Sequence, residues 1–205
     1  ELNLSANKTA EQQYLLGVLP SQDQWNYTFG VVYKHFGKNN FITAVASRNM
    51  LNNESNKYEN NDESSEANLL LNYQSQEIEN KLRLENNWYR NNLKIYYGVA
   101  YEYVKYNNAT YQKRSDPSGN VFLIDFSSQL DFSKFAGFGQ ISYPFFDRRL
   151  ITSFGLRTDF TNYDESMSNP LDQLSPRLSL TYNISDQFNL NFNAGIYHQL
   201  PPGGG

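Results

Sequence analysis

The segment of residues 93–106, LKIYYGVAYEYVKY, decides the fold class because apolar and polar side chains alternate along it. The odd-numbered positions carry Leu93, Ile95, Tyr97, Val99, Tyr101 and Tyr103. The even-numbered positions, which form the other parity, are mostly small or polar, with Lys94, Tyr96, Gly98, Ala100 and Glu102. Successive side chains of a strand point to opposite faces of a sheet, so this period of two indicates a β-strand with one apolar face.

The same alternation recurs along the chain, and no stretch of helical period rivals it. In residues 188–196 the polar parity is a run of Asn189, Asn191 and Asn193 followed by Gly195. We therefore predict an all-β, antiparallel protein of about nine strands. The expected strands are residues 1–9, 25–36, 41–51, 77–89, 93–106, 132–143, 150–161, 175–184 and 188–199.

Composition excludes several classes of protein. The 205 residues include 16 Tyr and 14 Phe, but the hydrophobic fraction is only 39% and cysteine is absent. No apolar run approaches the 18 residues of a transmembrane helix, and without cysteine there is no disulfide framework or thiol chemistry. A net charge of −4 provides no basic surface for nucleic acid.

Loop lengths separate a soluble β-sandwich from an outer-membrane barrel, because such barrels alternate short periplasmic turns with long extracellular loops. Short turns are expected at residues 37–40, 90–92, 144–149 and 185–187, and long connections at 10–24, 52–66, 107–120 and 162–174. Aromatic residues such as Phe36, Trp88 and Phe145 flank the short turns, as in the aromatic girdle at a membrane interface. Both observations favour an antiparallel transmembrane β-barrel with one face against lipid.

Two segments do not follow the simple pattern. Between residues 67 and 89 the apolar parity changes near residues 74–77, which suggests a bulge within one long strand or an extra hairpin. We favour the long strand, projecting outside the membrane. Residues 121–130, before the strand at Phe132, are likewise assigned to an external extension.

Five short runs give the sequence a specific resemblance. They are FAGFGQISY (135–143), FDRRL (146–150), GLRTD (155–159), SPRLSL (175–180) and YHQLPP (197–202). In this order they resemble the barrel of TonB-dependent outer-membrane receptors, and the Asn-, Tyr- and Lys-rich style resembles the Bacteroidetes type. The resemblance implies that residues 1–202 form a partial, central piece of such a barrel, with a Gly-rich end or truncation scar at 203–205.

The resemblance also implies partners and a function. A 22-stranded parent barrel would supply the remaining strands, and a plug domain, which is absent here, would contact the TonB complex through a missing N-terminal segment. The implied function is binding and import of a scarce nutrient of siderophore, cobalamin or glycan type through the bacterial outer membrane, without enzymatic activity. Two alternatives stay open, a passive porin or structural barrel and a secreted carbohydrate-binding β-sandwich.

Several side chains are candidate contact sites. Arg157, Asp159 and Arg177 are expected to face the lumen, where they can contact a plug or ligand or simply form an ion pair between neighbouring strands. Aromatic residues of the external segments can bind a sugar or siderophore, or merely end long strands. These residues are Tyr58, Tyr106 and Tyr111.

The remaining polar groups predict no cofactor and no metal site. The acidic residues of 52–66 offer oxygen ligands but match no EF-hand spacing, so a solvated loop is the default interpretation. His35 and His198 stand alone, without a nucleophile or metal-ligand partner in sequence.

Overall fold

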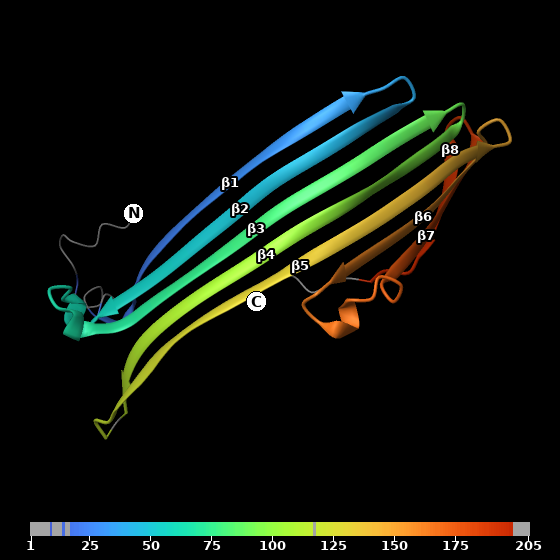
Figure 1. Ribbon diagram of the computed structural model, residues 1–205. Helices are drawn as coiled ribbons and strands as arrows, with labels where there is room; N and C mark the ends of the chain where they lie inside the picture. Colours follow the sequence, from blue (N-terminus) through green and yellow to red (C-terminus); the bar gives the residue numbers. More distant parts are fainter. Residues whose placement is uncertain (1–8, 10–13, 15–16, 117, 199–205) are drawn as a thin grey trace. The chain divides into compact units, whose positions relative to one another are not determined.

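The computed structural model describes residues 9, 14, 17–116 and 118–198, and within them the chain forms one sheet of eight strands. The strands pair in the order of the sequence, from β1 to β8, as Figure 1 shows. Their bounds are β1 Ser21–Phe36, β2 Asn40–Tyr58, β3 Leu69–Arg90, β4 Leu93–Ser115, β5 Val121–Phe145, β6 Leu150–Thr161, β7 Leu174–Ser185 and β8 Phe188–Gly195. The all-β, antiparallel prediction is confirmed.

Eight of the nine expected strands are present, and the ninth, at residues 1–9, falls almost entirely outside the described residues. The described strands are mostly longer than expected. No helix in the described part of the chain has the length and apolar character needed to span a membrane. A second sheet, as a β-sandwich requires, is not found among the described residues either.

All four expected short turns are present. Two residues, Asn91 and Asn92, join β3 to β4, and Asn91 takes a left-handed φ of 52°, which asparagine tolerates better than most residues. The turn from β5 to β6 places Phe146, Asp147 and Arg148 at φ values of 51°, 49° and 69°. Asn183 supports this turn, because its Nδ2 donates to the Arg148 carbonyl at 3.0 Å.

Two of the long connections begin later than expected, which corrects two predicted loops, whereas the connection at residues 162–173 agrees with the prediction. Strand β2 continues to Tyr58 and β4 continues to Ser115, so residues 52–58 and 107–115 are strand. The parity change near residues 74–77 lies inside one continuous β3, and residues 121–130 belong to β5. In residues 52–58 and 107–115 alternation fails as a guide because both faces are largely polar, although the backbone goes on pairing.

The chain divides into two compact units. The first comprises residues 1–27, 49–78 and 105–130, and the second comprises residues 28–48, 79–104 and 131–205. Among the described residues, three short 3-10 helices occur in the connections: Glu59–Asn61 and Glu66–Asn68 in the first unit, and Glu165–Met167 in the second.

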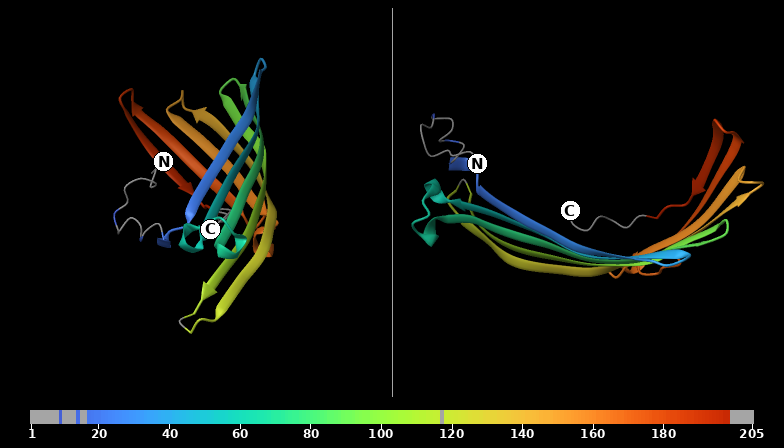
Figure 2. Two further views of the ribbon diagram at one scale, coloured as in Figure 1. Left: turned by 90° about the vertical axis from the view of Figure 1, so that its left-hand side faces the viewer. Right: turned by 90° about the horizontal axis from the view of Figure 1, so that it is seen from above.

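The second unit has two faces of opposite character. Strands β6, β7 and β8 lie side by side in Figures 1 and 2, and their register aligns Phe154 with Leu178 and Leu178 with Ala194. The neighbouring parity aligns Ser153 with Ser179 and Ser179 with Asn193. The apolar parity therefore forms one continuous apolar face, and the other parity forms a polar face.

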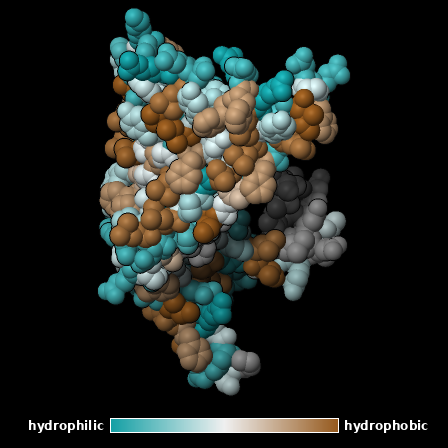
Figure 3. All heavy atoms as spheres, turned by 90° about the vertical axis from the view of Figure 1, so that its right-hand side faces the viewer, coloured by the Kyte–Doolittle hydropathy of each residue, from teal (hydrophilic) through white to brown (hydrophobic). Residues whose placement is uncertain are grey.

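The apolar face is exposed rather than packed into a core. Val99 is 58% exposed and Phe192 57%, while Met50, Val104 and Phe132 are the buried hydrophobic residues of the described part. Figure 3 shows hydrophobic side chains over much of the visible surface, with hydrophilic side chains at the tips along its upper edge. Soluble monomers rarely expose so large an apolar surface, so this face requires an apolar medium.

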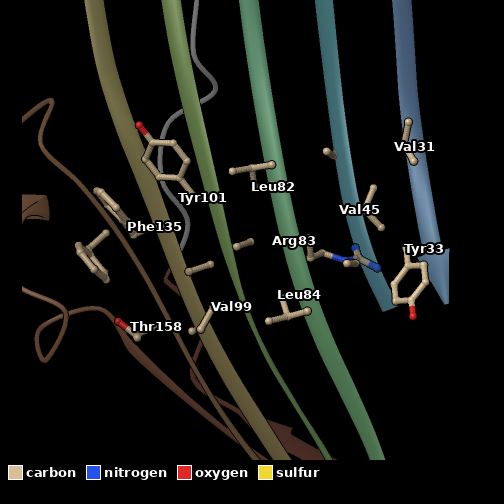
Figure 4. Close-up of a pocket in the computed structure, with 16 residues that line it drawn as sticks. Val31, Tyr33, Val45, Leu82, Arg83, Leu84, Val99, Tyr101, Phe135 and Thr158 are labelled. Carbon is tan, nitrogen blue, oxygen red and sulfur yellow. The ribbon is translucent and has the colours of Figure 1, made fainter. Parts of the chain in front are cut away.

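A shallow hollow of about 680 Å³ lies in the apolar face of the second unit. Small residues, Ala44, Ala46 and Gly137, lie in the hollow among larger apolar side chains. Figure 4 shows Val31, Leu82, Leu84, Val99 and Phe135 among these side chains. Because the hollow belongs to the apolar face, we assign it to contact with lipid chains.

The two faces can be tested on adjacent residues of β7. Leu178→Arg places a charge on the apolar face and is expected to lower the free energy of unfolding by about 2–4 kcal/mol, the cost of arginine on the lipid side of a barrel. Ser179→Arg, on the polar face, is the matched control. Urea unfolding of the full-length protein in phospholipid vesicles measures both variants, and equal effects would contradict the assignment of the faces.

A second test concerns the turn from β4 to β5. The Asp116 carboxylate accepts hydrogen bonds from the backbone N–H groups of Ser118 and Asn120 and from Asn120 Nδ2, at 2.8–2.9 Å. The bonds from Asn120 are the main cause that holds the pKa of Asp116 below its usual value of 3.8. Because the pKa is lowered in the folded state, the carboxylate stabilises the turn above about pH 3.8. This stabilisation is lost as the pH falls through the folded-state pKa.

Hydrogen exchange of the peptide covering this turn measures the effect. Protection relative to the intrinsic exchange rate should fall below about pH 4 in the natural protein. The variant Asp116→Asn keeps an acceptor oxygen but does not titrate, so its protection should not change over the same range. An equal acid-induced loss in both proteins would show that other groups open the turn.

Candidate functional site in the polar face

The polar face of the second unit carries a set of charged and aromatic side chains. The strand register places Arg157 opposite Phe138 on β5 and opposite Ser175 on β7, and places Gly155 opposite Arg177. A hollow of about 340 Å³ lies in this face, over β3 to β7. Its lining includes Arg83, Glu85, Tyr96, Phe138, Arg157 and Arg177.

Arg157 and Asp159 form a two-pronged salt bridge. Arg157 Nε and Nη2 each donate to one carboxylate oxygen of Asp159, both at 2.6 Å. Both residues belong to β6, so the ion pair lies within one strand and not between neighbouring strands as predicted. Residues two apart on a strand point to the same face, which explains how the pair forms along β6.

The Arg157 guanidinium also lies over the ring of Phe138, at 5.8 Å from the ring centroid. The Phe138 ring contacts the ring of Tyr96, with centroids 5.1 Å apart. Tyr96 then donates its hydroxyl to Glu85 Oε1 at 2.7 Å, and Arg83 Nε contacts the same oxygen at 2.7 Å. A chain of contacts thus connects a cation on β6 to a cation on β3.

Gly98 makes room for this chain of contacts. A Cβ atom at this position would lie 2.6 Å from Phe138 Cζ and 2.5 Å from the carbonyl oxygen of Leu84. Only glycine therefore allows the Phe138 ring to lie across strand β4. A glycine in a strand often marks such a close approach of a side chain or another backbone.

Arg177 has different surroundings from Arg157. Its guanidinium lies over the ring of Tyr197, 4.8 Å from the centroid, and it forms no salt bridge within the described residues. The polar face therefore presents one arginine neutralised by a carboxylate and another held by an aromatic ring. Such a ring orients a guanidinium while leaving its hydrogen-bond donors available.

A second charged cluster was not singled out from the sequence. Lys81 contacts Glu79 at 2.7 Å and Glu102 at 3.8 Å, and Lys134 contacts Glu102 at 3.5 Å. The cluster connects β3, β4 and β5 within the second unit. The sequence indicates only the face on which Glu102 lies, because Glu102 and Tyr96 both occupy even-numbered positions of the same strand. The partners on other strands depend on a register that the sequence does not show.

The three candidate tyrosines do not come together. Tyr106 faces Tyr73, with hydroxyl oxygens 3.5 Å apart, and accepts a hydrogen bond from Asn108 at 3.2 Å. Tyr111 has the opposite parity on β4 and therefore points to the other face. Tyr58 ends β2 and borders the 3-10 helix Glu59–Asn61.

The acidic loop of the first unit uses its oxygens locally. Asp62 accepts from the Ser64 N–H at 3.0 Å and from Asn68 Nδ2 at 3.0 Å. The Ser64 bonds are the main reason that the pKa of Asp62 is lowered. Among the residues described, no three acidic or histidine side chains cluster as metal ligands would.

Comparison with known proteins identifies the class. The family model described as "TonB dependent receptor-like, beta-barrel" matches residues 3–205. The chain belongs to this family, as the resemblance predicted, and is an outer-membrane protein. None of the curated proteins matches the chain in sequence.

One solved structure shows the same fold. The "Copper transporter OprC" aligns with a TM-score of 0.61 and 15% identity, over 92% of this chain and 32% of that one. The ferric preacinetobactin receptor BauA from Acinetobacter baumannii aligns with a TM-score of 0.46 and 11% identity, over 84% of this chain and 30% of that one. This chain therefore spans about a third of the length of these proteins. The Bacteroidetes type stays a prediction.

The aromatic part of the site can be tested at Gly98. Gly98→Val should displace the Phe138 ring and strain the strand pairing, lowering the free energy of unfolding by about 1–3 kcal/mol. Gly139→Val is the matched control, because a Cβ there meets nothing within 4 Å. Urea unfolding in vesicles is the measurement. A variant at Gly98 as stable as the control would show that the ring has room to move.

Proposed function

We propose that this chain forms part of the barrel wall of a TonB-dependent transport receptor, which binds a scarce nutrient outside the cell and imports it through the lumen. The observation that supports this proposal best is the two-faced sheet. Its apolar face suits outer-membrane lipid. Its polar face presents the Arg157–Asp159 pair, Arg177 and the charged cluster around Lys81 and Glu102. The role is transport, not enzymatic catalysis.

The sheet needs further strands to work in a membrane. Strands β1 and β8 each have one neighbour, so each leaves a row of backbone groups unpaired within the described sheet. Lipid does not tolerate such open edges, because unpaired N–H and C=O groups there cost several kcal/mol each. We infer that the sheet pairs with other strands of a larger closed barrel, of which residues 1–202 are a part.

A plug domain inside that barrel is the partner that the polar face fits. Arg177, oriented by the Tyr197 ring, can donate hydrogen bonds to carbonyl or carboxylate oxygens of a plug or a passing ligand. Arg157 is engaged by Asp159, so its role is more structural. Pulling on the plug by the TonB complex would then open a path along this face.

Energy dependence distinguishes the receptor from a passive porin. In cells that carry the full-length protein, uptake of its limiting nutrient should stop when an uncoupler removes the proton-motive force. The nutrient is found first, by growth of a deletion strain on defined iron, cobalamin and glycan sources. Uptake that continues at an unchanged rate after uncoupling would identify a passive pore instead.

The role of Arg177 is tested in the same cells. Arg177→Ala should reduce uptake severalfold while leaving the amount of folded protein in the outer membrane unchanged. Ser179→Ala, two residues away on the same face of β7, is the matched control. Normal uptake by the Arg177 variant would remove Arg177 from the transport path.

A further inference from the structure

We propose that one face of the first unit, the face that carries Gln24, Asn53 and Tyr73, binds an uncharged, polyhydroxylated ligand, namely an oligosaccharide. This inference rests on the proposed function and names its substrate class. A hollow of about 590 Å³ lies in this unit, over strands β1 to β4. Its lining includes Gln24, Asn53, Ser55, Tyr73, Thr110 and Gln112. The volume is within the range of small-ligand sites.

Amides and hydroxyls predominate among the lining residues, which also include Leu71. Gln24 Nε2 donates to Asn53 Oδ1 at 2.7 Å, and Asn53 Nδ2 donates to Ser75 Oγ at 3.4 Å. These bonds connect β1, β2 and β3 across one face. They also restrain the two amide groups before any ligand arrives, which reduces the entropy lost on binding.

Strands β3 and β4 continue the same face. Thr110 Oγ1 donates to Asn108 Oδ1 at 2.9 Å, and Asn108 Nδ2 donates to the Tyr106 hydroxyl at 3.2 Å. The Tyr106 hydroxyl in turn lies 3.5 Å from that of Tyr73. Amides and hydroxyls both donate and accept hydrogen bonds, as sugar hydroxyls do, so each group can pair with a hydroxyl in either sense.

Charge argues against an anionic ligand at this hollow. Asp23 and Glu54 border it, but they have the opposite parity from Gln24 and Asn53, so their carboxylates point to the other face. Glu54 accepts from Asn56 Nδ2 at 2.9 Å there. No arginine or lysine is among the residues that line the hollow.

Tyr73 supplies an aromatic surface beside these polar groups. Its side chain is half-buried, with the hydroxyl engaged and the ring bordering the hollow. An aromatic ring with a polar tip suits a ligand that has both apolar ring faces and hydroxyl edges. A pyranose ring has this combination, whereas a polyanionic iron chelate needs cations that the hollow lacks.

Calorimetry on the full-length protein in detergent tests the proposal. The probes are uncharged gluco-, fructo-, xylo- and N-acetylglucosamine oligosaccharides, an anionic ferric catecholate and cyanocobalamin. We expect binding of one oligosaccharide class, with affinity lowered at least tenfold in the Gln24→Ala/Asn53→Ala double variant. The matched control removes the amide pair Gln76 and Asn107, joined at 3.3 Å on the other face of β3 and β4. Gln76→Ala/Asn107→Ala should change affinity less than twofold.

A milder variant keeps the test valid if the double variant fails to fold. Tyr73→Phe retains the ring and should weaken oligosaccharide binding about threefold to tenfold. Binding of the ferric catecholate or of cyanocobalamin alone, or oligosaccharide binding unchanged in Tyr73→Phe and in a folded double variant, overturns the proposal. Failure here is separable from failure of the proposed function. If the protein imports another nutrient with energy but binds no oligosaccharide, the transport function stands and the oligosaccharide proposal is wrong. If it binds an oligosaccharide but uptake does not depend on energy, the oligosaccharide proposal stands and the energy-dependent transport function is wrong.

Discussion

The structure depends on one constraint: a chain in lipid must pair every backbone N–H and C=O group within the protein. Neighbouring strands that follow one another in sequence satisfy it with short turns, and eight such strands are described here. Because each side chain then points to one of two faces, the apolar residues face lipid and the polar residues are left on the opposite face. The low hydrophobic fraction of 39% follows from this division.

In the second unit, contacts between side chains order the polar face although it is not packed into a core. Glycine at position 98 lets the Phe138 ring cross strand β4, and that ring lies between Tyr96 and the Arg157 guanidinium. Aromatic contacts and carboxylates thereby hold long cationic side chains in place without a hydrophobic core. The first unit achieves order differently, through amide and hydroxyl pairs such as Gln24 with Asn53. The two units therefore differ in the polar chemistry that they present.

The candidate site was predictable only in part. The sequence indicated that Arg157, Asp159 and Arg177 share the polar face, and the register places Arg177 opposite Gly155, two residues before Arg157. It did not indicate that Arg157 pairs within its own strand, or that Lys81, Glu102 and Lys134 form a cluster across three strands. Parity is a local property of one strand, whereas partners on other strands depend on register.

The sequence by itself determined the all-β class, the two faces and the four short turns, because alternation and turn residues act over a few positions. The family was indicated separately, by the resemblance of five short runs between residues 135 and 202. Tertiary structure alone decided the length of β2 and β4, the continuity of β3 through its parity change, and the meeting of Gln24, Asn53 and Tyr106 on one face. The physical reason is that these features depend on backbone pairing between strands. Pairing continues where both faces are polar and the alternating pattern disappears.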